Sequence, residues 1–243
     1  MKFKSIALAA AALAAGLAAA PAGAVLIPLT QVELSGQGVG ATFTTLFLQG
    51  AGSATTESGG VLFNGTPFGD AGGGASQTRT FTFADLALTN ANQLALVLNV
   101  AEPGSENPPS VTTAASPLAT NANLANAITL NVYSSAGALL EQHVAASGLT
   151  LNQVASGLGG SGIVFALDAA EVIQLNNTMA ANAGNEVFTV GATFANSQGG
   201  PETISAIRLT QAVGAIPEPE TYALMLAGLG AICFMSRRRG KRS

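Results

Sequence analysis

The sequence predicts an all-β fold, built as an antiparallel β-sandwich with a jelly roll as one form of it, and containing one short helix. Three observations lead to this fold class. Apolar and polar residues alternate with a period of two in most of the central region, as in strands with one buried face. Stretches rich in Gly, Asn and Pro separate these segments at short intervals. Nine or ten short strands with such spacing are typical of sandwiches and jelly rolls.

The alternation is clearest in four segments. Between residues 79 and 83, phenylalanines alternate with threonines, and at 94–100, 128–132 and 188–194 every second residue is apolar. Further strands are expected at 31–34, 41–48, 61–63, 138–144, 162–167 and 203–210. The pattern does not determine the order of the strands in the sheets.

The single helix is expected to begin after Asp168. Asp168 and Glu171 are spaced as the N-cap and N3 residues of a capping box, and an apolar stretch follows them. The segment 102–125 contains four prolines among Ser, Thr, Asn and Ala, which predicts a surface loop.

The first 24 residues have the pattern of a secretory signal peptide. Lys2 and Lys4 provide a basic start, residues 6–17 are apolar, and Ala22-Gly23-Ala24 forms an A-x-A cleavage site before Val25. We therefore expect an exported protein whose folded domain, the ectodomain, spans residues 25–216.

The C-terminal segment, residues 217–243, has three parts. Pro217-Glu218-Pro219 is followed by an apolar stretch at 222–235, which as a helix measures about 21 Å against roughly 30 Å of bilayer hydrocarbon. The segment ends in a basic cluster, which the positive-inside rule places in the cytoplasm. Its members are Arg237, Arg238, Arg239, Lys241 and Arg242.

In this order, the three parts resemble the PEP-CTERM sorting signal of exported bacterial proteins. The resemblance implies that a membrane enzyme, exosortase, recognises the tripeptide, cuts nearby, and passes the ectodomain to the cell surface or to exopolysaccharide. It covers about a ninth of the chain. The alternative is an ordinary single-pass anchor, which would have the same topology but would not be processed.

Charge and cysteine content exclude several classes of function. Residues 25–216 contain two basic and 11 acidic residues, so their net charge is near −9, and they contain no lysine. Such a surface repels phosphate backbones, so nucleic acid is not an expected partner. The one cysteine, Cys233, lies in the apolar C-terminal stretch, which excludes disulfides and cysteine chemistry in the ectodomain.

Two motifs are candidates for a catalytic or a nucleotide-binding site. Residues 157–162 match G-x-G-x-x-G by letter, but an apolar strand pattern follows them where the dinucleotide motif requires a helix, so we interpret them as a turn. His143 lies near serines and Glu141, yet no G-x-S-x-G sequence is present. We therefore expect His143 on a solvated strand face rather than in a catalytic triad.

Acidic residues in predicted loops are candidates for calcium, which binds six to eight oxygen ligands. Glu102, Glu106 and Glu202 are the candidate ligands of a structural Ca²⁺, although their spacing matches no EF-hand. The alternative is that the acids are solvated and keep the protein soluble. No other cofactor is expected.

The leading functional hypothesis is a non-enzymatic surface or matrix protein, associated with exopolysaccharide or biofilm. The main alternative is a carbohydrate-binding jelly roll, for which Tyr133 is the one tyrosine of the ectodomain that could stack on a sugar. A secreted hydrolase that uses His143 is the third hypothesis.

Overall fold

The computed structural model describes residues 25–29, 43–52, 54–72, 77–102, 109–118, 124–153 and 162–209. The predicted signal peptide, the predicted strand at 31–34 and the C-terminal segment 217–243 lie outside these residues. The strands are β1 Val25–Leu29, β2 Phe43–Leu48, β3 Thr56–Val61, β4 Pro67–Gly69, β5 Leu94–Val100, β6 Ser110–Thr113, β7 Ile128–Tyr133, β8 Leu139–Ala145, β9 Thr150–Asn152, β10 Ile163–Leu167, β11 Val187–Ala195 and β12 Glu202–Arg208. Two 3₁₀ turns, η1 Ala84–Leu86 and η2 Ala91–Gln93, and the helix α2 Ala169–Ala181 complete the described elements.

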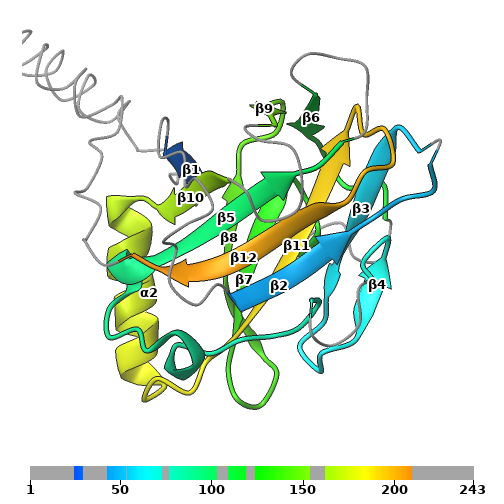
Figure 1. The fold of residues 1–243 in the computed structure, drawn as a ribbon. Coiled ribbons are helices and arrows are strands. Elements are labelled where there is room, and N and C mark those ends of the chain that lie inside the picture. Colours follow the sequence, from blue (N-terminus) through cyan, green and yellow to red (C-terminus); the bar gives the residue numbers. More distant parts are fainter. Residues whose placement is uncertain are drawn as a thin grey trace, which may run out of the picture.

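The strands form one continuous sheet that curls into a half-barrel (Figure 1). Its order is β2-β12-β5-β10-β1-β8-β7-β11-β3-β4, and the β6–β9 pair attaches to β11. Beside β4, Ala71 forms an isolated bridge with Leu48 of β2, and Gly72 N donates a hydrogen bond of 3.0 Å to Phe47 O. The predicted β-rich class with one helix is thus confirmed, but the division into two separate sheets is not.

The strand β1 makes the sheet mixed rather than purely antiparallel. It pairs antiparallel with β10 over four residues and parallel with β8 at Val25 and Leu26. Pairing with β8 ends at Leu26, and Pro28, which has no N–H to donate, follows this end. The prediction of an all-antiparallel sheet was therefore wrong at this one pair of strands.

The hydrophobic core lies inside the curled sheet. Phe188 of β11 stacks on Phe81 and Phe83 at centroid distances of 5.2 and 4.9 Å. Helix α2 closes one end of the core with Leu175, which is fully buried. Within the described residues, no helix is both long and apolar enough to span a membrane.

Most predicted strands are present, and the differences have local causes. The segment 79–83 forms only a bridge from Phe81 to Phe188, because Thr82 and Asp85 hydrogen-bond each other's backbone N–H groups and start η1. Residues 62–66 form a tight turn after β3 instead of the predicted strand at 61–63. The predicted loop 102–125 contains β6, which pairs with β9 and β11.

Candidate functional site

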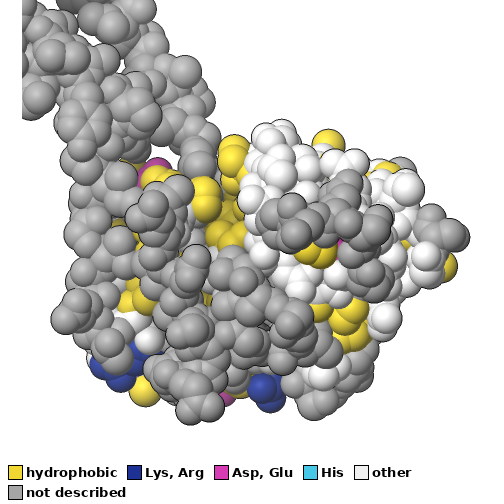
Figure 2. All heavy atoms as spheres, turned by 45° about the horizontal axis from the view of Figure 1, so that its top comes forward, with side chains coloured by type: hydrophobic (Ala, Val, Ile, Leu, Met, Phe, Trp, Pro, Cys, Tyr) yellow, Lys and Arg dark blue, Asp and Glu magenta, His cyan; other side chains and the backbone are white. Residues whose placement is uncertain are grey.

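The acidic residues of the domain are mostly buried. Of the nine that the structure describes, seven are buried and only Asp70 and Asp85 are exposed. On the face drawn in Figure 2, acidic side chains are visible only as small spots among uncharged and hydrophobic ones. The alternative of solvated acids therefore does not hold for these seven residues, which lie in the interior, where they must be paired or neutralised. Six of the seven buried acids form two groups, one beside helix α2 and one at the start of β12, and Glu186 is the seventh.

The first group surrounds His143, in the middle of β8. His143 is fully buried, its Nε2 lies 3.1 Å from Glu141 Oε2, and its Nδ1 lies 3.2 Å from Glu171 Oε1. Glu141 also accepts a hydrogen bond from the hydroxyl of Thr178 on α2. Glu171 and Asp168 form the predicted capping box, with Glu171 N to Asp168 Oδ1 at 2.8 Å.

The two carboxylates keep His143 protonated. Burial alone would lower the pKa of His143, but hydrogen bonds and charge interactions with Glu141 and Glu171 raise it to about 9. Although burial opposes ionisation of Glu141, its hydrogen bonds to His143 and Thr178 leave its pKa below the usual value. Burial raises the pKa of Glu171. The group therefore contains one positive charge held between two buried glutamates.

This geometry corrects the expectation for His143. Glu141 and His143 do share a strand face, as their spacing predicts, but that face points into the core beside Leu130 and Val132, which are paired with them on β7. Both ring nitrogens face carboxylates, so neither is directed at a hydroxyl group as a Ser-His-acid triad requires. The sequence contains no sign that Glu171, 28 positions away, is the second partner.

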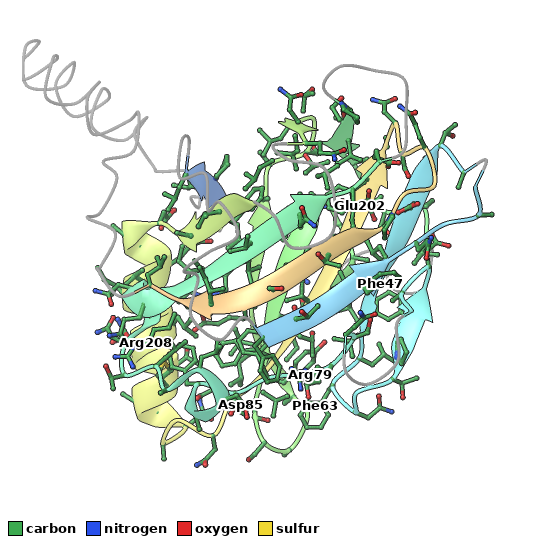
Figure 3. The ribbon with its side chains drawn as sticks, in the orientation of Figure 1. Phe47, Phe63, Arg79, Asp85, Glu202 and Arg208 are labelled. Carbon is green, nitrogen blue, oxygen red and sulfur yellow. The ribbon has the colours of Figure 1, made fainter. Side chains whose placement is uncertain are left out.

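The second group contains Glu57, Glu102 and Glu202, whose side chains are 0%, 4% and 1% exposed. Glu202 opens β12 at the end of the sheet opposite Arg208 (Figure 3). Glu57 and Glu102 are the two acidic neighbours that act on Glu202. Burial, together with these two neighbours, raises the pKa of Glu202 to about 12.

Backbone amides hold the two outer carboxylates in place. Glu57 Oε1 accepts a hydrogen bond from Gly50 N at 2.8 Å, and Glu102 Oε2 accepts from Gln198 N and Gly200 N at 2.8 and 2.9 Å. Glu57 Oε2, Glu102 Oε1 and both oxygens of Glu202 have no hydrogen-bond donor. The structure thus brings together two of the three predicted calcium candidates, Glu102 and Glu202, and adds Glu57. Glu106 lies outside the described residues.

Tyr133 is buried, and residues 157–161 of the glycine-rich stretch lie outside the described residues. Tyr133 does point away from the Ile128, Leu130 and Val132 face, as predicted, but it is only 7% exposed and packs against Phe63 at a centroid distance of 5.6 Å. Gly162 is followed directly by β10, which confirms the strand where a dinucleotide motif needs a helix.

The remaining predicted residues belong to the two ends of the chain. The described residues include Val25, the first residue of β1, but not Ala22 and Ala24 of the predicted cleavage site. They end at Leu209, so Pro217, Glu218, Pro219 and the basic cluster Arg237, Arg238, Arg239, Lys241 and Arg242 also lie outside them.

Comparison with known proteins identifies the C-terminal segment. Residues 215–239 match the PEP-CTERM protein-sorting motif, which includes the tripeptide, the apolar stretch and the first three arginines. Neither the curated proteins nor the solved structures contain a match to this chain. The match confirms the resemblance seen in the sequence, and this chain is therefore a PEP-CTERM domain-containing protein, a target of exosortase-type sorting.

Proposed function

We propose that this protein is a non-enzymatic component of the cell surface or extracellular matrix, which exosortase-type processing releases from a transient membrane anchor. The observation that carries the proposal is the sorting motif at residues 215–239, placed directly after a β-rich domain with a buried core. The matrix, exopolysaccharide and biofilm associations are the proposed destinations of the processed domain.

The direction of β12 supports one orientation of the domain before processing. This strand runs from Glu202 to Arg208, and Leu209 N then donates a hydrogen bond of 2.8 Å to Gln93 O in η2 (Figure 3). Seven residues lie between Leu209 and Pro217, so eight steps of at most about 3.5 Å in a fully extended chain span about 28 Å. We therefore expect the end with Arg208, η2 and α2 to lie nearer the membrane than the Glu202 end.

The described residues support a structural role over the two alternatives. His143, the one histidine of the chain, is enclosed by two glutamates, which disfavours a hydrolase that uses it as a general base. Tyr133 is packed against Phe63, which disfavours a sugar-stacking role for its ring. A binding partner in the matrix, such as exopolysaccharide, would then contact other surfaces of the domain.

The test is cell fractionation and intact-mass measurement of the protein produced in its native host. In the wild type we expect loss of residues 1–24 and of the basic cluster, with the processed domain in the surface or matrix fraction. In the variant Pro217→Ala/Glu218→Ala/Pro219→Ala, we expect the unprocessed tail and retention in the membrane fraction.

The control is Gln211→Ala, which changes a residue of the same connecting segment but not the motif and should leave processing unchanged. If the wild type keeps its basic cluster and stays in the membrane, the segment is an ordinary anchor and the proposal is wrong. Processing of the triple variant at the wild-type rate would show that the tripeptide is not the recognised element.

A further inference from the structure

The second acidic group lies where three parts of the chain converge. Glu202 is paired with Leu48 of β2 on one side and with Val100 of β5 on the other. Glu102 follows Val100 by two residues, and Glu57 reaches the same place from β3 through its contact with Gly50, which follows Leu48 by two residues. The register of the sheet therefore places a glutamate on each side of Glu202.

Two loops pack over this group. A Cβ atom on Gly199 would lie 2.6 Å from the Cα of Gly52, so the loops at 50–52 and 197–200 are in direct contact. Gly199 also has a φ of +76°, which disfavours any side chain there. Backbone N–H groups of these loops donate hydrogen bonds to Glu57 Oε1 and Glu102 Oε2. The other carboxylate oxygens of these two residues, Glu57 Oε2 and Glu102 Oε1, have no donor.

No basic side chain neutralises the group among the described residues. The two arginines of the ectodomain are engaged or distant: Arg79 lies over the ring of Phe43 at 3.6 Å, and Arg208 lies at the opposite end of β12 (Figure 3). The ion pairs of the described chain both involve His143. Three carboxylates that share a buried position without a cation would repel each other strongly.

We propose that Glu57, Glu102 and Glu202 form a binding site for a divalent cation with a preference for oxygen ligands, of which Ca²⁺ is the best fit. The four carboxylate oxygens without donors supply ligands of the kind that Ca²⁺ requires, and its variable coordination accommodates water or backbone carbonyls as well. Mg²⁺ fits less well, because it demands near-ideal octahedral geometry.

As the side chains lie, no group of three or more acidic, histidine or cysteine residues in the described ranges is arranged to hold a metal ion. Cation binding therefore requires rotations of the Glu side chains that direct their free oxygens at one ion, and it displaces the proton that Glu202 carries at neutral pH.

The test uses the full chain, purified in detergent and stripped with EDTA. Titration calorimetry with CaCl₂ at pH 7.5 should show saturable binding at one site, and 1 mM Ca²⁺ should raise the melting temperature by several degrees. NaCl at matched ionic strength should leave the melting temperature unchanged, because non-specific screening does not provide ligands.

The variants Glu202→Gln and Glu57→Gln should each weaken Ca²⁺ binding at least tenfold. The matched control is Glu186→Gln, which changes another buried glutamate whose carboxylate has no donor and whose pKa is raised by burial, but which does not belong to this group. It should keep wild-type affinity. Glu202→Gln should also melt cooperatively in EDTA at or above the wild-type temperature, because an amide can occupy the place of a protonated carboxyl.

Three results would overturn the proposal. The first is wild-type protein that shows neither heat nor a melting shift with Ca²⁺, which would mean that protons alone neutralise the group. The second is Glu202→Gln protein that retains full affinity. The third is equal loss of binding in Glu186→Gln, which would place the cation elsewhere.

Discussion

Oε1 of Glu171 lies 3.2 Å from Nδ1 of His143, and this contact joins the first turn of α2 to the middle of β8. The same carboxylate closes the capping box, because its other oxygen accepts a hydrogen bond of 3.1 Å from Asp168 N. One side chain therefore both starts the helix and fixes it on the sheet.

Replacing His143 with leucine should destabilise the domain strongly. The substitution leaves Glu141 and Glu171 buried without their shared cation, and breaking a buried ion pair in this way costs about 3–5 kcal/mol. Urea denaturation followed by circular dichroism measures the loss. The control is Val144→Ala on the same strand, where the side chain is only half-buried and a smaller loss is expected. A loss below about 1 kcal/mol in His143→Leu would show that the two glutamates are neutralised without His143.

The stability of the protein should fall between neutral and alkaline pH because of the same group. The pKa of His143 is about 9 in the folded protein and near 6.5 when unfolded, so the folded state binds more protons in this interval. The contribution is fully present below pH 6.5 and is lost as the pH rises through 9, with an upper bound of about 3 kcal/mol. Urea unfolding at pH 6.5 and 9.5 measures it. His143→Gln should show a smaller fall, and an equal fall in both proteins would exclude His143 as its source.

The sequence was most informative where apolar alternation coincides with a regular strand. The patterns at 94–100, 128–132 and 188–194 became β5, β7 and β11, and the acids at 168 and 171 became the capping box. Strand β3 was missed because Gly59 and Gly60 interrupt its pattern. Those glycines are needed because a Cβ on Gly60 would lie 2.9 Å from Gly191 Cα on the paired strand.

The candidate sites were harder to predict, because they depend on contacts between distant parts of the chain. Glu102 and Glu202 were predicted as neighbours of a cation, but nothing in the sequence indicates that Glu57 joins them, since it lies in the missed strand β3. The contact of His143 with Glu171 on α2 was missed for a similar reason, because the glutamate of a capping box normally forms its hydrogen bond within its own helix. The C-terminal sorting motif was predictable because its three parts are contiguous.

Gly191→Ala should prevent normal packing of the central strand β11. A Cβ at this position would lie 1.9 Å from the carbonyl oxygen of Leu124, which is backbone and cannot rotate away. We expect a loss of more than about 3 kcal/mol or failure to accumulate folded protein. The control is Gly52→Ala, where a Cβ would meet no atom within 4 Å. Thermal unfolding compares the two, and equal stability would contradict the close approach of Leu124 to β11.

Strand β1 should be essential because it connects the two halves of the sheet. It lies between β10 and β8, and Leu26 is buried in the core while Ile27 is half-exposed. Leu26→Ala should cost about 2–5 kcal/mol, and Ile27→Ala should cost less, because the cavity left in the core is larger at Leu26. Cleavage before Val25 would make the first residue of the mature chain the first residue of β1. Urea unfolding and limited proteolysis of the two variants measure the loss of stability at each position. Equal losses at both positions would show that β1 is not anchored through Leu26.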